Sequence, residues 1–320
     1  SVDSFADFLC VQHLHGLWLN ALEGNDLDAR QEALRSLLAF RVRKDEVRAL
    51  PHQRLLSDAK HALDSADIPW FITKGAQFRH MLYDKSWLRP NADTDLFVHA
   101  DRQKRAIAVL REAAFQPVAS AENLSHEINL FKHGGAIDLH WHLLRPGRIR
   151  PGLMDWLFSR REKFGEFWGL DDTASLFVML VHPTITKYLL SPTSMLIHQV
   201  DQARLIERGR VDWDELENAL DRSGTRTAAW ASLYVLKMLG GIAAPGSFEE
   251  KLRPGRIHRW YLRQWIDRAW ITRWFEKRWL VAGFFSLALQ YSASDAVRAL
   301  RTLHASRGSA LDQVVESDGA

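Results

Sequence analysis

Two carboxylates stand out because of their spacing and their neighbours. Asp93 and Asp95 come directly before the apolar run Leu96 to Val98, which is typical of a buried strand. Residues two apart on a strand point to one face, so these side chains are predicted to aim at one point, about 7 Å apart at the backbone. Two carboxylates aimed together repel each other unless a cation lies between them, and hard oxygen ligands suit Mg²⁺. The spacing therefore predicts a divalent-metal site.

A second feature lies just upstream of this pair. The apolar run Trp70 to Ile72 stops at Lys74-Gly75, and a short amphipathic segment, residues 75–83, follows. This order predicts a strand, a glycine turn and a helix, and the start of a helix is a natural binding place for phosphate. Phosphate and metal sites side by side outline a site that handles nucleotides.

The elements that position these residues lie between residues 66 and 170. Strand-like runs alternate there with short helical segments, and a glycine pair, Gly134-Gly135, indicates a hairpin turn. The strand after that turn is therefore predicted to be antiparallel to its predecessor, residues 127–132. On it, Asp138, His140 and His142 are predicted to share one face. This pattern predicts an α+β fold with a small mixed sheet on which helices pack.

Helical periodicity flanks this core on both sides. Residues 4–22, 26–40 and 44–65 read as helices, with Pro51 a kink or break in the third. Helical patterns return after residue 170 and are interrupted at Pro183. The predicted organisation is an N-terminal helical segment, a mixed-sheet core, a helical C-terminal domain and a frayed tail (residues 1–65, 66–170, 171–310 and 311–320).

Composition narrows the class of protein. Of the 320 residues, 47% are hydrophobic and 25% charged, as in a soluble globular protein with a sizeable core. The single cysteine excludes a disulfide framework and a thiolate zinc site, and favours a reducing cytoplasm. Charge-free stretches are too short to span a bilayer. The net charge of +3 does not by itself require a polyanionic partner. We therefore expect a cytoplasmic protein without a transmembrane segment.

Three motifs carry a resemblance to a known family. KGAQFRHMLY, RPNADTDLFV and IDLHWHLL resemble an uncharacterised nucleotidyltransferase family of the polymerase-beta-like superfamily. The resemblance covers roughly residues 66 to 235 and includes LIHQVDQARLIERGRVDWDEL. It implies the mixed sheet of that superfamily for the core, whereas the N-terminal helices and the segment after residue 240 lie outside the resemblance.

The resemblance also implies an activity. Members of the superfamily move a nucleoside monophosphate from an NTP to an acceptor and release pyrophosphate, and two metal ions hold the reacting oxygens. Carried over to this chain, Asp93, Asp95 and Asp138 would bind Mg²⁺, with Mn²⁺ as an alternative, and would be the catalytic carboxylates. The nucleotide-binding residues would be Lys74, Gly75, Ala76, Arg89 and His140. Alanine at position 76, where many superfamily members have serine, leaves phosphate binding to backbone amides and Lys74.

The histidines near Asp138 have two interpretations. A metal site of the D-x-H-x-H type is conceivable, because Asp138, His140 and His142 share a face. The interpretation we favour makes His140 a hydrogen-bonding neighbour of the carboxylates and His142 a residue at the strand end. His182 and Asp201, in the helical region, either face the nucleotide or are hydrogen-bonded core residues.

A basic, tryptophan-rich segment spans residues 253–280. Interleaved arginine and tryptophan can stack on bases and neutralise phosphates, or bind an anionic membrane surface. An amphipathic helix with buried tryptophans and solvated arginines explains the same pattern. The tryptophan spacings of five, five, four and five drift around a helix, so not all five rings can share one buried stripe.

The sequence thus predicts an Mg²⁺-dependent nucleotidyltransferase that uses an NTP as donor. ATP and GTP are the donors that we favour. Its acceptor would be a hydroxyl or phosphate of a peptide, protein or small molecule, with an RNA end as a further alternative. Two other functions stay open: a non-catalytic nucleotide-binding sensor or adaptor that kept the fold, and an RNA-binding protein that uses residues 253–280.

Overall fold

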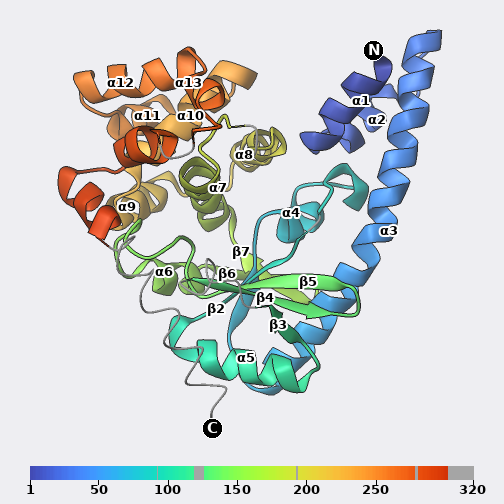
Figure 1. Ribbon diagram of the computed structural model, residues 1–320, viewed down its shortest axis with the longest axis horizontal. Helices are drawn as coiled ribbons and strands as arrows, with labels where there is room; N and C mark the ends of the chain where they lie inside the picture. The colour runs from blue at the N-terminus through green and yellow to red at the C-terminus, as the bar shows by residue number, and fades with distance from the viewer. Residues whose placement is uncertain (92, 119–125, 192–193, 278–279, 302–320) are drawn as a thin grey trace.

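The computed structural model describes residues 1–91, 93–118, 126–191, 194–277 and 280–301. A five-stranded mixed sheet lies at the centre, in the order β1-β2-β5-β4-β3, and helices surround it (Figure 1). The predicted α+β class is therefore confirmed. The strands are β1 (Trp70–Ile72), β2 (Asp95–Val98), β3 (Gln116–Val118), β4 (Glu127–Lys132) and β5 (Gly135–His140).

The pairing of β2 with β5 sets the register of the sheet. These two strands run parallel, with Asp95 opposite Asp138, whereas the other neighbouring pairs are antiparallel. A parallel pair cannot be joined by a tight turn. The chain accordingly leaves β2, forms α5 (Gln103–Glu112) and β3, and returns through β4 to β5.

The predicted hairpin between β4 and β5 is present, but its turn lies one residue earlier than predicted. His133 and Gly134 form the two-residue loop, and both have positive φ, as a type I′ hairpin turn requires. Gly135 is instead the first residue of β5. A Cβ atom there would lie 2.6 Å from Cδ1 of Leu55, so this glycine lets β5 pack closely on α3 (Ala29–Ser65).

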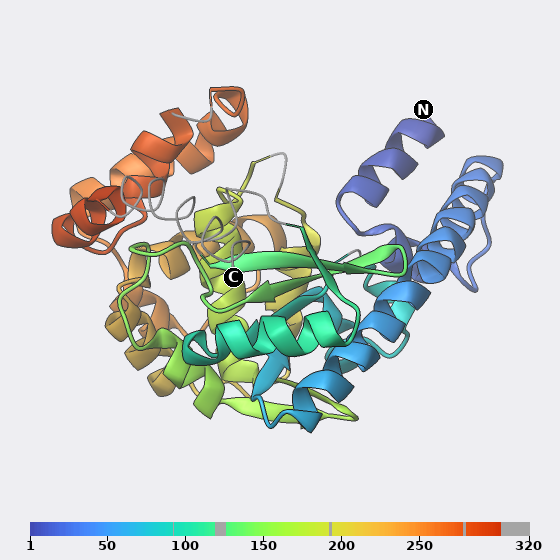
Figure 2. The same cartoon turned by 60° about the horizontal axis from the view of Figure 1, so that its bottom comes forward.

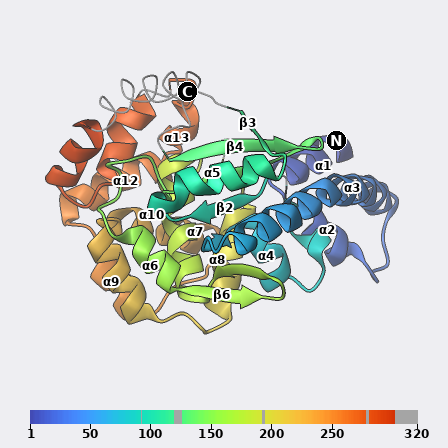
Figure 3. The same ribbon diagram turned by 90° about the horizontal axis from the view of Figure 1, so that it is seen from below.

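Each face of the sheet has its own hydrophobic core. On one face, Trp70, Leu96 and Leu139 pack with side chains of α3 and α5, which lie across the sheet in Figure 3. On the other face, Phe71 and Phe97 belong to a large core that continues through the helical half of the chain. The second face is therefore the one that the C-terminal helices cover.

The N-terminal helices differ from the predicted ones in their boundaries. Residues 4–22 form two helices, because His13 has a φ of 56° and interrupts them. Residues 29–65 form one helix of 37 residues, which begins at a capping box of Asp28 and Gln31 and continues through Pro51. The predicted break at Pro51 is wrong. The first two helices are α1 (Val2–Val11) and α2 (His15–Leu22).

The C-terminal half is helical, as predicted, with two differences. Pro183 lies inside α7 and does not interrupt it, and residues 161–170 form an unpredicted hairpin of β6 (Arg161–Phe164) and β7 (Phe167–Leu170). The remaining helices are α4 (Gly75–Met81), α6 (Leu153–Ser159), α7 (Asp172–Thr186), α8 (Ile197–Glu207), α9 (Trp213–Ser223), α10 (Arg226–Gly240), α11 (Gly246–Leu252), α12 (Arg256–Asp267) and α13 (Trp270–Arg273). Short 3₁₀ turns occur at Ser86–Leu88 and Ala100–Arg102, and a π-helical turn at Val281–Ser286.

The helices lie in two groups around the sheet. In Figures 1 and 2, α1 and α2 with the first half of α3 lie on one side of the molecule, and α11 to α13 lie on the other side. Helix α7 stands between them, above the sheet. Among the residues that the structure describes, none of the helices combines the length and the apolar character that a membrane crossing requires.

Candidate active site

The centre of the site is a pair of carboxylates on neighbouring strands. Asp95 is the first residue of β2, and the parallel register places it directly beside Asp138 of β5. The backbone N–H of Asp138 donates to the carbonyl of Thr94 at 2.9 Å, which extends the ladder past the start of β2. Single ligand atoms of Asp95, Asp138 and His140 all lie within 4.8 Å of one another. The sheet thus holds two carboxylates and an imidazole around one point.

Lys74 provides the positive charge of the site. Its Nζ donates to Oδ1 of Asp95 at 2.9 Å and lies 3.3 Å from Nε2 of His182, on α7. Lys74 has a φ of 56° and a ψ of −134°, a conformation that favours glycine and strains other residues. The turn between β1 and α4 therefore holds the ammonium group in place against Asp95.

The pKa values show how the charges are balanced. Burial alone would raise the pKa of Asp95, but Lys74 and His140 outweigh it and hold that pKa well below its usual range. Burial and the negative charge of Asp95 raise the pKa of Asp138 to about 6. Partial desolvation and the same charge of Asp95 raise the pKa of Asp93, whose side chain is exposed. The site thus concentrates more negative charge than Lys74 neutralises, and a divalent cation fits it.

His140 is fixed next to these carboxylates. The side chain is only 4% exposed, and its ring stacks on Phe97 with centroids 4.7 Å apart. Its Nε2 lies 3.0 Å from Oδ1 of Asp95, and its Nδ1 lies 3.1 Å from Oε2 of Glu127. His142, in contrast, is not on the strand with His140. Strand β5 ends at His140, so the prediction that Asp138, His140 and His142 share a strand face is wrong for His142, which lines a separate cavity with His99.

Strand β4 brings two further polar residues that the sequence analysis did not single out. Glu127 pairs with His140, and Asn129 pairs with Asp138, across the β4–β5 hairpin. The side-chain amide of Asn129 donates to Oδ1 of Asp138. Glu127 and Asn129 lie two residues apart on β4 and so point to one face, and the hairpin turn fixes which residues of β5 lie opposite them. This spacing was the sequence signal that could have identified them.

Asp93 is separate from this cluster. It precedes β2, its side chain is exposed, and it is not among the ligand atoms that converge within 4.8 Å. Asp93 lies two residues before Asp95, and the ladder extends to Thr94 between them, so their expected convergence on one metal stays a prediction. The charge of Asp93 still acts on the cluster, since it is one cause of the raised pKa of Asp138.

The predicted phosphate-binding turn lies beside Lys74. Gly75 and Ala76 are buried in the first turn of α4, where N–H groups have no partner within the helix. A Cβ atom on Gly75 would lie 2.2 Å from Oδ1 of Asn91. Glycine is therefore required for the close approach of this turn to the loop that precedes β2.

Arg89 is not directed at an open site. The buried guanidinium binds both carboxylate oxygens of Asp201 on α8, with Nε–Oδ2 and Nη2–Oδ2 distances of 3.0 and 2.8 Å. Its Nη1 donates to the carbonyl of Pro90 at 2.8 Å, and the hydroxyl of Tyr83 also donates to Asp201. These contacts link the loop before β2 to the helical half. Asp201 is therefore a hydrogen-bonded core residue, whereas His182 faces the site through Lys74.

The tryptophan-rich segment is partly buried and partly exposed. Trp265 is buried in the large core and Trp270 packs against it, whereas Trp260 and Trp274 are exposed. The exposed face of α12 carries Arg256, Arg259 and Arg263 beside Trp260. The amphipathic-helix interpretation therefore describes part of the segment only. Arg278 and Trp279 lie outside the described residues, as does the predicted frayed tail, residues 311–320.

Comparison with known proteins completes the picture of the site. A search of the curated proteins and a search of the solved structures found no significant match to the chain. A family described as an uncharacterised nucleotidyltransferase matches residues 1–241, and so includes the N-terminal helices as well as the sheet and α7 to α10. The match covers more than half of the chain and includes Lys74, Asp95, Asp138 and His140. The chain belongs to this nucleotidyltransferase family.

Proposed function

We propose that the protein transfers a nucleoside monophosphate from an NTP to an acceptor, with a divalent metal ion, and releases pyrophosphate. ATP or GTP is the donor that we favour, and the acceptor is a hydroxyl or phosphate of a peptide, protein or small molecule. The observation that carries the proposal is the side-by-side register of Asp95 and Asp138, with Lys74 bound to Asp95. Two aligned carboxylates and one cation suit the handling of a metal-bound triphosphate.

The donor set fits a divalent ion. Asp95 and Asp138 would hold it, with the exposed Asp93 at the edge of the site near the incoming nucleotide. When bound, the ion would withdraw charge from the phosphate oxygens and lower the pKa of the attacking hydroxyl. The residues of the chain itself then have separate tasks in binding, orientation and proton transfer.

Lys74 and the first turn of α4 would bind the triphosphate. The ammonium group of Lys74 lies between Asp95 and His182, and the N–H groups of Gly75 and Ala76 begin the helix next to it. Arg89 would act on the nucleotide indirectly, because its contacts with Asp201 and Pro90 fix the loop that ends at Asp95. We therefore assign Arg89 a positioning role in place of direct phosphate contact.

Asp138 is suited to take the acceptor's proton. In the reaction, an acceptor oxygen forms a bond to the α-phosphorus, the bond from that phosphorus to the bridging oxygen of the β-phosphate breaks, and pyrophosphate leaves. The acceptor's proton would pass to the carboxylate of Asp138, which the register places beside Asp95 at the centre of the site. The amide of Asn129 would hold that carboxylate in orientation.

Label transfer tests this proposal directly. The purified chain is incubated with α-³²P-labelled ATP or GTP, Mg²⁺ or Mn²⁺ and a cell extract, and labelled products and released pyrophosphate are measured. We expect Asp95→Asn and Asp138→Asn each to lower transfer by more than about a hundredfold, because each removes a charge that the transition state requires. Asp26→Asn is the matched control, since Asp26 lies exposed between α2 and α3.

The outcomes separate the proposed enzyme from the alternatives. Nucleotide binding without label transfer to any product would contradict the enzyme and favour a sensor or adaptor. Label that nuclease treatment removes would identify RNA as the acceptor, and label that protease treatment removes would identify a peptide or protein. Transfer that survives both Asp95→Asn and Asp138→Asn would place the activity at another site.

A further inference from the structure

His140 lies next to Asp95 in a position that differs from that of a hydrogen-bonding partner. The Nε2 atom is 3.0 Å from Oδ1 of Asp95 and Nδ1 is 3.1 Å from Oε2 of Glu127, yet neither buried ring nitrogen makes a hydrogen bond of acceptable direction in the described part of the chain. Nε2 and Oδ1 of Asp95 therefore lie side by side, and the imidazole nitrogen does not point along the line to the oxygen. A buried nitrogen without an aligned partner is costly unless something else binds it.

The spacing of these atoms is that of two ligands of one ion. Nitrogen and oxygen ligands lie about 2.0–2.2 Å from Zn²⁺, and Mg²⁺ holds oxygen at a similar distance. Two such ligands at a right angle are separated by about 3.0 Å, which follows from the same bond lengths. The third ligand atom, on Asp138, also lies within 4.8 Å of both. One ion can thus contact all three side chains with small movements.

The surroundings of His140 hold its ring in this orientation. The ring is stacked on Phe97, with an interplanar angle of 12°, and Oε2 of Glu127 lies 3.1 Å from the other nitrogen, Nδ1. Histidine ligands of metals commonly have a carboxylate next to the nitrogen that does not bind the ion. The β4–β5 register places Glu127 opposite His140 and so provides that carboxylate.

From this geometry we infer that the proposed metal site is a mixed nitrogen–oxygen site in which Nε2 of His140 binds the ion directly, beside Asp95 and Asp138. The inference rests on the metal dependence of the proposed function. An imidazole ligand favours a first-row transition-metal ion over Mg²⁺, because Mg²⁺ prefers oxygen ligands and loses its water reluctantly. The site therefore prefers an ion such as Mn²⁺ to Mg²⁺.

Pulsed electron paramagnetic resonance of bound Mn²⁺ tests this without any catalytic readout. The full chain is loaded with one equivalent of Mn²⁺, and the electron spin echo is examined for modulation by a directly bound ¹⁴N nucleus. We expect ¹⁴N modulation in the unchanged protein, its loss in His140→Gln and its retention in His142→Gln. His142 is the matched control because it lies two residues further on and lines a separate cavity.

Two additional measurements distinguish the loss of a nitrogen ligand from misfolding of a variant. Protein labelled with ¹⁵N-histidine carries no substitution, and its modulation is expected to change to the ¹⁵N pattern. In competition titrations, His140→Gln is expected to weaken Mn²⁺ binding by about tenfold or more and to change Mg²⁺ binding little. Circular dichroism checks that each variant is folded.

Each outcome supports or overturns the inference. Mn²⁺ that is lost in Asp95→Asn but shows no nitrogen modulation in the unchanged protein would make His140 a positioning residue for Asp95 only. Absence of Mn²⁺ binding would also overturn the inference. Neither result decides the proposed function, because label transfer with Mg²⁺ is measured separately and depends on Asp95 and Asp138.

Discussion

Lys74 has a backbone conformation that lysine rarely adopts, at a φ of 56° and a ψ of −134°. A side chain in such a region costs of order 1–3 kcal/mol and persists where the surroundings impose it. Here the surroundings are the buried strand β1, the close contact of Gly75 with Asn91 and the ion pair with Asp95. The strain thus accompanies the placement of a cation at the candidate site.

Two substitutions separate this strain from the charge of Lys74. Lys74→Gly and Lys74→Met both remove the ammonium group, but only glycine adopts this conformation without strain. We expect the glycine variant to be more stable than the methionine variant by about 1 kcal/mol, since the freedom of glycine in the unfolded chain offsets part of the relief. Urea denaturation measures the difference, and label transfer is expected to be lost in both variants.

The same pair of substitutions at Lys85 is the control. Lys85 has a φ of −121°, which any residue adopts, so glycine is expected to give no gain over methionine there. If Lys74→Gly were no more stable than Lys74→Met, the backbone at Lys74 would not be strained.

At the scale of residues, local spacing predicted some neighbours and missed others. The hairpin signal placed Asp138 and His140 on one strand face, and the same turn fixes Glu127 and Asn129 opposite them. Glu127 and Asn129 were not predicted as site residues, because their spacing on β4 indicates a role only once the opposite residues of β5 are known. Asp93 was expected to converge with Asp95; β2 begins at Asp95, and the charge of Asp95 acts on Asp93.

At the scale of elements, the loop before β2 is tied to α8 by one buried ion pair. Arg89 and Asp201 have side-chain exposures of 4% and 0%, and the hydroxyl of Tyr83 donates to the same carboxylate. Removal of one partner leaves the other charge buried and unpaired, which costs about 3–5 kcal/mol. This pair therefore couples the position of the loop that leads to Asp95 to the helical half of the chain.

We expect Asp201→Asn to lower the free energy of unfolding by about 3–5 kcal/mol because it leaves the Arg89 guanidinium without a compensating charge. Chemical denaturation measures this loss. Tyr83→Phe removes only one hydrogen bond to the same carboxylate and is expected to cost about 1 kcal/mol.

A double substitution provides the control for the pair. Arg89→Met with Asp201→Leu removes both charges and is expected to destabilise the protein by less than the sum of the single effects. Additive losses would show that Arg89 and Asp201 contribute independently.

The proline positions show why helix boundaries were harder to predict than helix existence. Proline inside a helix removes one backbone hydrogen bond, and this loss usually ends the helix. Helix α3 nevertheless continues through Pro51, which is exposed, while Leu55, Ala59 and Leu63 on its buried face pack against the sheet. Helix α7 likewise continues past Pro183 within the large core. Tertiary packing of this kind is not visible in local sequence.

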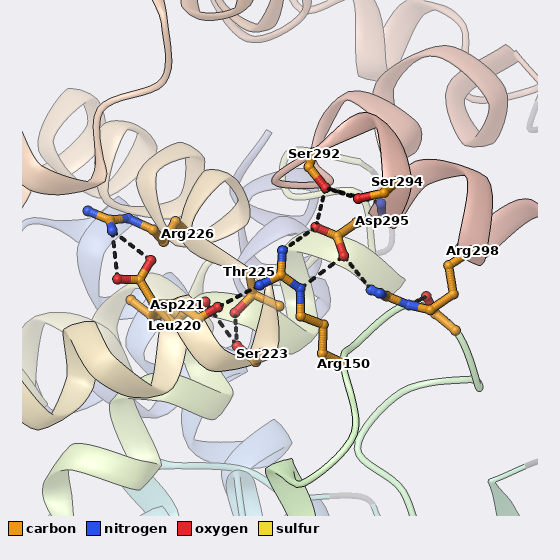
Figure 4. Close-up of polar contacts among 11 residues, drawn as sticks. Arg150, Leu220, Asp221, Ser223, Thr225, Arg226, Ser292, Ser294, Asp295 and Arg298 are labelled. Carbon is orange, nitrogen blue, oxygen red and sulfur yellow. Dashed lines mark hydrogen bonds and ion pairs between the residues drawn. The ribbon is translucent and has the colours of Figure 1, made fainter.

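At the scale of the whole molecule, one network joins three distant parts of the chain. Asp295 accepts hydrogen bonds from both Nε and Nη2 of Arg150, at 3.0 and 2.7 Å, and forms an ion pair with Arg298 (Figure 4). Arg150 follows β5 and also donates to the carbonyl of Asp221 near the end of α9. The α+β class was predictable from the alternation of strands and helices, whereas contacts across 145 residues were not.

The acid dependence of stability follows from this network. Hydrogen bonds from Arg150, together with Ser292 and Arg298, outweigh burial and hold the pKa of Asp295 well below its ordinary value. An aspartate whose pKa is lowered by folding stabilises the folded state above its unfolded pKa of about 3.9, and this contribution is lost as the pH falls further.

We expect Asp295→Asn to lower the free energy of unfolding by about 2–3 kcal/mol at pH 7, because it removes the charge from charge-assisted hydrogen bonds. Urea denaturation from pH 8 to pH 3 should show a constant difference between the two proteins down to about pH 5 and a narrowing below about pH 4. Asp26→Asn, at an exposed loop, is expected to show no such difference at any pH. A difference that narrows already above pH 6 would mean that another group controls the docking of the helical segment 293–301, which carries Asp295.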